Sequence, residues 1–266
     1  MATTTMSTVD KALSLLRHFS VQKSELGLSE LARLANFDKT TTLRCMTALE
    51  RNGFVEQDEQ SRKYRLGLAP INLAQIRERS FPVNGVIKRY LDDLAQTYGE
   101  TAHASLFVGK DLVTAAISEP DRALRVHVDP SEILPWHATA SGIAVSAYLP
   151  AEDQEHLLSQ RDLQTFTRST PTEVDALRDA WSLCLTQGIS RAEETFEKDV
   201  VGTAAPIFGP SGRPMGAVAV ASVSLRMTSD LQVQLDAALR GAARSITHEL
   251  GGKPPALQPG SVLPST

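Results

Sequence analysis

The sequence predicts an α+β protein with two domains, a small N-terminal one and a larger C-terminal one. Three observations support this fold class. Hydrophobic residues recur at helical spacing as far as Arg51 and then alternate with a period of two. Phe81-Pro82 interrupts the chain after a helical segment, and segments typical of strands and helices follow it. The 266 residues are also enough to form two hydrophobic cores.

The first predicted helix begins at Ser7 or Thr8, either of which can cap it, and runs to about Phe19. Its apolar residues lie at helical spacing and form one face: Val9, Ala12, Leu13 and Leu16. We expect this face to close the core of the N-terminal domain.

The second predicted helix covers residues 30–35 and has Ser29 as its N-cap. Its apolar residues fall on one side: Leu31, Leu34 and Ala35. Asn36 and Phe37 then form a tight turn, so a further helix is expected to follow closely.

The third predicted helix covers residues 39–51, between the capping residue Asp38 and a left-handed end at Asn52-Gly53. Its inward face, with Cys45 at the margin, consists of Thr42, Met46 and Leu49. The opposite face carries hydroxyl and guanidinium groups and no carboxylate: Thr40, Arg44, Thr47 and Arg51. Such a face suits phosphates and base edges, and Leu43 beside it could touch a thymine methyl group.

A basic hairpin is predicted next, with strands at residues 54–57 and 63–66. Tyr64, Leu66 and Leu68 are expected to share one face of its second strand. Two helices, a sharp turn and a basic hairpin in this order predict a winged helix-turn-helix, which binds double-stranded DNA. The alternative is that the polar face of the third helix is merely solvated, but the order of the elements favours DNA binding.

The charge and composition restrict the class of protein. Residues 1–79 hold 12 Lys and Arg against 9 Asp and Glu, which gives a net charge of +3. Because the whole chain has a net charge of −4, residues 80–266 carry a net charge of −7. This asymmetry agrees with a basic DNA reader joined to an acidic domain. Cys45 and Cys184 form no disulfide or metal pattern, so we expect neither metal nor cofactor. No transmembrane run or signal peptide is evident, which favours a cytoplasmic protein without a membrane partner.

A helical linker and a domain boundary are predicted after the hairpin. Apolar residues lie at roughly helical spacing over residues 69–79, and Pro82 marks the boundary. A tail rich in Pro, Gly and Ser is expected to be disordered. The predicted organisation is a winged helix-turn-helix domain at 1–68, a linker at 69–82, an effector-binding domain at 83–250 and the tail at 251–266.

The second domain is predicted to open with a helix that ends at Gly99. Strands are expected at residues 101–108, 112–118 and 124–128. In the last of these, apolar residues alternate with Arg125 and His127, which gives one core face and one polar face. A helix is then predicted to start at Thr139. Its open N–H groups could bind an anion, or Thr139 could simply cap it while Gly142 allows close packing, and both interpretations stay open.

The remaining elements are a mainly helical region at 151–187, strands at 189–208 and 214–225, and a last helix at 228–250. In the last strand Ala217, Ala219 and Ala221 face one way and two valines the other. An alanine face packs tightly against a helix or leaves a cavity, and packing is the commoner outcome.

Two other functions are compatible with parts of the sequence. His137 and Ser141 are four residues apart, as a base and a nucleophile on one helix would be, which would suit a small hydrolase. No acid orients this pair, and the sequence has no Gly-x-Ser-x-Gly, phosphate loop or metal spacing, so no catalytic residue is assigned. A sensor acting only through protein partners would require an N-terminal domain that does not bind DNA.

Five stretches have a specific order and spacing: TVDKALSLL at 8–16, LSELA at 28–32, KTTTLR at 39–44, LPWHATASG at 134–142 and AAPIFGPSGRP at 204–214. Together they resemble the IclR family of bacterial transcription regulators from about Ser7 to Leu250. The resemblance implies a winged helix-turn-helix and a GAF-like α/β effector domain with an antiparallel sheet. It also implies homodimers through the DNA-binding domains, usually tetramers through the effector domains, an inverted-repeat operator and small organic acids or aromatic catabolites as effectors.

Position by position, the resemblance implies recognition-helix contacts at Lys39, Thr40, Thr41 and Arg44 and a wing at residues 62–64. With the residues argued above, the candidate DNA contacts are Ser29, Lys39, Thr40, Thr41, Leu43, Arg44, Arg62, Lys63 and Tyr64. The positions that match the family's effector pocket are Ala140, Ser141, Ala192, Gly202, Ala219 and Ala221.

The chain departs from the glyoxylate-responsive pattern, which has an acidic residue at 192, a cysteine at 202 and serines at 219 and 221. All four are small and nonpolar here, and Ile143 replaces a lysine. A tiny polar acid would lose hydrogen bonds worth roughly 0.5 to 1.5 kcal/mol each. We therefore expect a more apolar pocket for an aromatic or short-chain aliphatic acid, with its carboxylate on the N–H groups near Ala140 and Ser141.

The candidate helpers for that acid are His103, Arg125 and His127 as cations and Trp136 as a stacking ring. For any one of the three basic residues, a place on a solvated sheet face is the competing interpretation.

Overall fold

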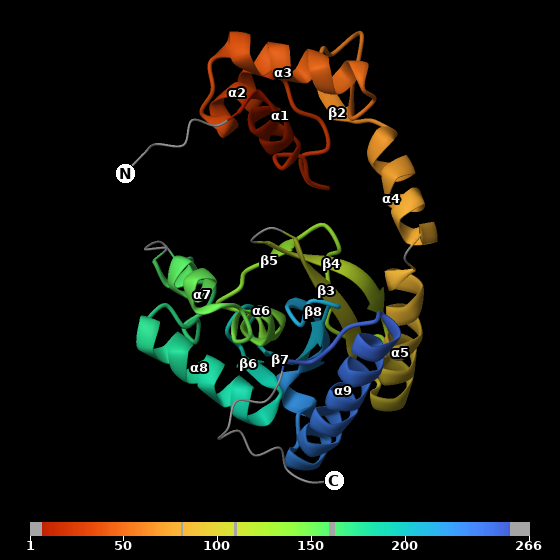
Figure 1. The fold of residues 1–266 in the computed structure, drawn as a ribbon, viewed down its shortest axis with the longest axis vertical. Coiled ribbons are helices and arrows are strands. Elements are labelled where there is room, and N and C mark those ends of the chain that lie inside the picture. The colour runs from red at the N-terminus through yellow and green to blue at the C-terminus, as the bar shows by residue number, and fades with distance from the viewer. Residues whose placement is uncertain (1–6, 81, 109–110, 160–162, 256–266) are drawn as a thin grey trace. The chain divides into compact units, whose positions relative to one another are not determined.

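The computed structural model describes residues 7–80, 82–108, 111–159 and 163–255. Contacts divide the chain into two compact units, residues 1–82 and 83–266, and each unit has a hydrophobic core (Figure 1). The predicted α+β class is confirmed, with a winged helix-turn-helix followed by a domain built on an antiparallel sheet. No helix within the described ranges is long and apolar enough to cross a membrane.

The N-terminal unit starts with three helices: α1 (Thr8–Leu16), α2 (Leu28–Ala35) and α3 (Lys39–Arg51). The bounds of α3 are those predicted. Asp38 caps α3 as expected, accepting a hydrogen bond from the Thr41 amide at 2.8 Å. Asn36 ends α2 in the left-handed conformation with φ 55°, which produces the tight turn between the two helices.

Two details of the first helices were predicted wrongly. Ser29 is not the N-cap of α2. The N-cap is Gly27, whose backbone is extended, and the helix begins at Leu28. The inward face of α1 is centred on the fully buried Leu15, whereas Val9 and Leu13 are 66% and 50% exposed. This helix has apolar residues on more than one side, and periodicity alone does not decide which side faces the core.

The wing is formed by β1 (Val55–Gln57) and β2 (Tyr64–Leu66), which pair antiparallel with Val55 opposite Leu66. Tyr64 also exchanges two backbone hydrogen bonds with Leu26, of 2.8 and 3.0 Å, and its side chain is buried in the core of the unit. Leu66 and Leu68 do not share this burial, since both are largely exposed. Cys45, expected at the margin of α3, lies fully in the core.

Helix α4 (Ala69–Ser80) follows the wing, where a linker helix was predicted. None of its described side chains is buried. Ile71, Leu73 and Ile76 are each more than half exposed, so this helix carries apolar surface that its own unit does not cover.

The C-terminal unit contains a six-stranded sheet in the order β5-β4-β3-β8-β7-β6, in which all neighbouring strands are antiparallel. Its strands are β3 (Thr101–Val108), β4 (Asp111–Ser118), β5 (Ile133–Leu134), β6 (Ser190–Glu193), β7 (Val200–Phe208) and β8 (Pro214–Val223). The central pair β3 and β8 comes from opposite ends of the domain in sequence. The centre of the sheet is therefore a pairing of two strands that are far apart in the sequence.

Helices cover both faces of this sheet (Figure 1). They are α5 (Val83–Tyr98) and α9 (Ser229–Glu249) on one face, and α6 (Ala140–Ser146) and α8 (Val174–Gln187) on the other, with α7 (Ala151–Leu158) beside α8 and a 3-10 turn at Ser224–Arg226. Val218 and Val220 of β8 belong to the core under α5 and α9. Ala217 and Ala219 belong to the core under α6 and α8, so the alternation in β8 separates two cores.

Residues 124–128 do not form the predicted strand. Side chains hold this segment instead of a strand ladder: Thr101 Oγ1 donates to the Val126 carbonyl at 2.6 Å, and Arg226 Nη1 donates to the Leu124 carbonyl at 3.3 Å.

The disordered tail was predicted to begin at residue 251, but the chain is still held by hydrogen bonds just beyond that point. Gly252 N donates to the Thr247 carbonyl at 2.7 Å and Lys253 N to the Gly209 carbonyl at 3.1 Å, while residues 256–266 lie outside the described residues.

Candidate nucleic-acid interface and ligand cavity

The exposed face of α3 presents the side chains expected for DNA binding. Lys39, Thr40 and Arg44 are exposed, and Leu43 is 46% exposed at the edge of this face. Thr41 is held back, because its hydroxyl donates to Asp38 Oδ2 at 2.7 Å as part of the helix cap. The face thus offers one ammonium, one guanidinium and hydroxyl groups on a rigid helix.

The two cationic candidates of the wing, Arg62 and Lys63, are both exposed. Arg62 has φ 58°, and its carbonyl accepts a hydrogen bond from Gln57 Nε2 at 2.8 Å, which fixes the turn. Tyr64 was predicted as a wing contact, and the structure contradicts this because its side chain is 2% exposed. Ser29, the remaining candidate, is the second residue of α2 and is exposed.

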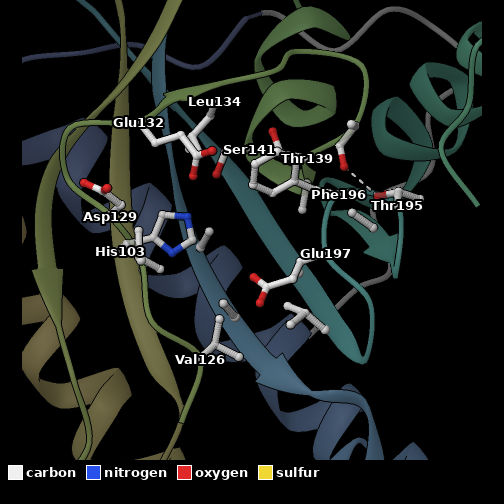
Figure 2. A pocket seen from close by; sticks show the side chains of 18 of the residues that line it. His103, Val126, Asp129, Glu132, Leu134, Thr139, Ser141, Thr195, Phe196 and Glu197 are labelled. Carbon is white, nitrogen blue, oxygen red and sulfur yellow. Dashed lines mark hydrogen bonds between the residues drawn. The ribbon is translucent and has the colours of Figure 1, made fainter. Parts of the chain in front are cut away.

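A cavity of about 90 Å³ lies between the sheet and the start of α6 in the C-terminal unit. It contains eight of the predicted effector contacts: His103, His127, Ala140, Ser141, Ala192, Gly202, Ala219 and Ala221. Figure 2 shows His103 and Ser141 at the centre of this space, with loop residues of 126–134 and 195–197 around it. The cavity is large enough for several water molecules or a small organic ligand.

Strand register explains the floor of the cavity. His103 lies opposite Ala219, and Gly202 lies between Ala221 on β8 and Ala192 on β6. Directly paired residues point to the same face, so these small side chains form a continuous row. A Cβ atom on Gly202 would lie 3.3 Å from the Ala140 Cβ, which shows how closely α6 approaches this row.

Two buried polar atoms in the cavity have no hydrogen-bond partner among the described residues: His103 Nδ1 and Ser141 Oγ. Burial lowers the pKa of His103 from 6.5 to about 4, because the desolvated ring disfavours a positive charge. The ring is therefore neutral at neutral pH. Buried polar groups are normally satisfied, so both atoms are candidates for contact with a ligand.

Three carboxylates that no sequence pattern marks also line the cavity: Asp129, Glu132 and Glu197. The carboxyl groups of Glu132 and Glu197 point toward the space beside His103 in Figure 2. Burial, and then the charges of Asp129 and Glu197, raise the pKa of Glu132. These residues lie in irregular segments, where no periodicity marks a residue as facing inward.

Arg125 and His127 do not act as the expected cations inside the cavity. Arg125 is absent from its lining and forms an ion pair with Glu119 at 2.8 Å. His127 borders the cavity, but its side chain is 78% exposed and its Nδ1 lies 3.4 Å from the same carboxylate. The strand predicted for residues 124–128 would have placed both side chains on one polar face of the sheet, but the observed segment is irregular and belongs to no strand.

Trp136 does not line the cavity either. Its ring packs in the core, 5.9 Å from the Trp181 ring and 5.6 Å from the His137 ring between centroids. The helix start at Thr139 is a capping and packing site: Thr139 Oγ1 accepts from Gly142 N at 3.0 Å, and a Cβ atom on Gly142 would lie 2.3 Å from the Trp136 carbonyl oxygen. Binding of a carboxylate by the neighbouring N–H groups stays a prediction.

Two family models match the chain, and together they span most of it. The model described as the IclR helix-turn-helix domain matches residues 8–59, and the model of the bacterial transcriptional regulator IclR C-terminal matches residues 78–248. The chain belongs to the IclR family. It is therefore a DNA-binding transcriptional regulator and not an enzyme.

Three relatives illustrate how far the IclR likeness extends. The glycerol operon regulatory protein of Streptomyces coelicolor is 29% identical over 250 residues, covering 92% of this chain and 97% of the relative. An ICLR transcriptional regulator from Silicibacter sp. TM1040 is 38% identical with a TM-score of 0.91, covering 95% and 100%. An IclR homolog complexed with 4-hydroxybenzoate, from Microbacterium hydrocarbonoxydans, shares the fold at 22% identity and a TM-score of 0.74, covering 92% and 99%.

The geometry of this IclR regulator also separates the pair that suggested a hydrolase. His137 Nε2 lies 3.0 Å from the Gln164 carbonyl oxygen, whereas Ser141 Oγ has no partner among the described residues. No base is therefore bonded to the hydroxyl. In the described ranges, no group of three or more His, Cys, Asp and Glu residues is placed to hold a metal ion.

Proposed function

We propose that this IclR-family protein regulates a catabolic operon by binding an inverted-repeat operator through α3 and the wing. The observation that carries the proposal is the exposed face of α3, where hydroxyl and guanidinium groups stand without a carboxylate: Thr40, Arg44, Thr47 and Arg51. Such groups contact phosphates and base edges. The glycerol operon regulator among its relatives supports a catabolic target.

The proposed assembly is a homodimer, or a tetramer made of such dimers, working in the cytoplasm. An inverted repeat has twofold symmetry and therefore requires two DNA-binding units. Largely exposed apolar side chains support contact between copies: Val9 and Leu13 on α1, and Ile71, Leu73 and Ile76 on α4. A second chain that covered these side chains would remove apolar surface from water.

We also propose that a small organic effector occupies the cavity of the C-terminal unit. The small side chains of its floor and the two unpartnered polar atoms support this role. The sequence predicts an aromatic or short-chain aliphatic acid, and the Microbacterium homolog is complexed with an aromatic acid. The three carboxylates around this cavity would repel the carboxylate of an acidic effector. We therefore propose a small, largely apolar effector and do not propose that it is an acid.

Regulation requires that the effector bind one arrangement of the paired DNA-binding units more tightly than another, since equal affinity shifts no equilibrium. Residues 69–82 connect the two units in the chain and are the proposed route of this coupling.

A gel-shift assay with DNA from upstream of the protein's own gene tests the proposal. We expect retardation at low salt, a weaker effect with unrelated DNA of the same length, and a change on addition of the effector. Absence of any retardation, with and without candidate metabolites, would overturn the assignment of an operator. A sensor that acts only through protein partners predicts that Arg44→Ala leaves promoter binding unchanged.

A further inference from the structure

The cavity has an unusual balance of charge for a site expected to take an acid. Glu132 and Glu197 point their carboxyl groups into it and Asp129 stands at its edge, while its described lining contains no Lys or Arg (Figure 2). A carboxylate placed among them would meet negative charge without a compensating cation. Burying an unpaired charge is costly, and a neighbouring charge of the same sign adds to that cost.

Arg125, which lies outside the lining, and His127, which borders the cavity, both face a carboxylate that is not part of the lining. Arg125 forms both a hydrogen bond and an ion pair with Glu119, at 2.9 and 2.8 Å, and His127 faces the same carboxylate. His103 does not supply a charge, because its buried ring is neutral at neutral pH. The described lining therefore contributes carboxylates and no Lys or Arg to the charge around a ligand.

The same cavity contains hydrogen-bonding atoms that a ligand could satisfy. His103 is 8% exposed and Ser141 is 2% exposed, and neither His103 Nδ1 nor Ser141 Oγ has a partner among the described residues. A neutral imidazole nitrogen and a hydroxyl oxygen can both accept a hydrogen bond. Beside them, Ala192, Gly202 and Ala219 leave a smooth apolar surface for the body of a small molecule.

We propose that this cavity selects a small organic ligand with a head group that donates hydrogen bonds, and that it binds an amine or amidine cation more tightly than a carboxylate of the same shape. The head lies near Glu132 and Glu197 and contacts His103 and Ser141, and the apolar body rests on the alanine and glycine floor. This inference rests on the proposed function and names the chemical class of its effector.

Three probes of nearly equal shape test the selection: benzamidine, benzamide and benzoate. Their affinities for the full-length protein are measured by isothermal titration at neutral pH. Benzamidine should bind most tightly and benzoate most weakly, with about a tenfold or greater difference between these two extremes. Equal affinity of benzamidine and benzoate, including the binding of neither, would overturn the proposal, as would a preference for benzoate.

Charge-neutral variants identify the groups responsible. Glu132→Gln and Glu197→Gln should each weaken benzamidine binding by about threefold to fivefold and improve the relative binding of benzoate. Glu152→Gln on α7 is the matched control, because it removes an exposed carboxylate that does not line the cavity. Equal losses in all three variants would show only a general effect of net charge and would contradict the assigned site.

A parallel gel-shift assay on the same samples separates this inference from the proposed function. If benzoate binds best and changes operator binding, the inference is wrong while a ligand-responsive regulator remains. If the protein fails to bind its upstream DNA, the proposed function is wrong whatever the order of the three affinities.

Discussion

His103 on β3 lies directly opposite Ala219 on β8, so the imidazole shares the sheet face of that alanine and points into the cavity. The methyl group of this alanine is too small to cover the ring, and it has no atom that could form a hydrogen bond with it. Helices and loops nevertheless bury the ring, and its Nδ1 has no partner among the described residues. The pairing of a large polar residue with a small apolar one produces both the space and its chemistry.

The neutral burial of His103 predicts a pH-dependent stability of the C-terminal unit. The pKa of the ring is about 4 in the folded protein and 6.5 in its unperturbed state, so the unfolded chain takes up a proton first as the pH falls. The neutral ring therefore contributes fully to the free energy of unfolding above about pH 6.5. This contribution, up to about 3 kcal/mol, is lost as the pH falls toward 4. Urea denaturation at several pH values measures this slope. His103→Gln should flatten it, and an equally steep profile in the variant would contradict the assignment.

A second prediction concerns the ion pair between Arg226 and Glu100. Glu100 is 1% exposed and accepts two hydrogen bonds from Arg226, at 2.6 and 2.7 Å. Arg226→Ala leaves the buried carboxylate without its partner and should lower the free energy of unfolding by about 3 to 5 kcal/mol. Arg213→Ala is the control, because Arg213 is exposed and forms a long ion pair of 3.9 Å with Asp153. This substitution should lower the free energy of unfolding by less than about 0.5 kcal/mol. Similar losses of unfolding free energy in both variants would contradict this prediction.

Burial of Tyr64 gives a third prediction, which separates packing from DNA contact. Tyr64→Ala should destabilise the N-terminal unit by about 3 to 5 kcal/mol, because it removes a large side chain from a small core. Tyr64→Phe keeps the ring and should leave operator affinity within about twofold of the wild type. Calorimetric unfolding and gel-shift titration measure the two effects. A large loss of DNA affinity in a stable Tyr64→Phe variant would restore the hydroxyl as a wing contact.

The N-terminal unit could be predicted closely because its signals are local. Asp38, Asn36 and Gly53 act within a few residues of the helix ends that they mark, and the bounds of α3 follow from them. The errors arose where distant partners decide the outcome. Tyr64 was included among the DNA contacts because the family resemblance places residues 62–64 in the wing. Local sequence does not reveal that Leu26, which precedes the hairpin, pairs with Tyr64.

The cavity could be predicted only in part, for a similar reason. The small residues at 192, 202, 219 and 221 were identified through the family resemblance, and strand register brings them together. Glu132 and Glu197 have no pattern that marks them, since they lie in irregular segments folded over the sheet. The polar chemistry of the cavity therefore depends on long-range folding more than its apolar wall does.

A fourth prediction concerns the contact of Arg44 with the operator. Arg44→Ala should weaken operator binding by about 1 to 3 kcal/mol if the guanidinium reads a base, with a much smaller loss on unrelated DNA. Arg79→Ala, which removes the same charge from exposed α4, is the control and should have little effect. Titrations at several salt concentrations separate the roles, since a phosphate contact lowers the salt slope by about one and weakens all sequences alike. Unchanged binding to both DNAs would remove Arg44 from the interface.

Two glycines in the C-terminal unit should respond oppositely to the same substitution. A Cβ atom at Gly142 in α6 would lie 2.3 Å from the Trp136 carbonyl oxygen, so Gly142→Ala must displace backbone beside the cavity. At Gly241 in α9 no heavy atom lies within 4 Å of the corresponding position, so Gly241→Ala gains helix propensity without a clash. We expect a loss of about 2 kcal/mol or more for the first and a gain of about 0.5 to 1 kcal/mol for the second. Thermal unfolding of both variants measures the difference, and a stabilised Gly142→Ala would show that α6 can move away from Trp136, contrary to the tight packing that shapes this cavity.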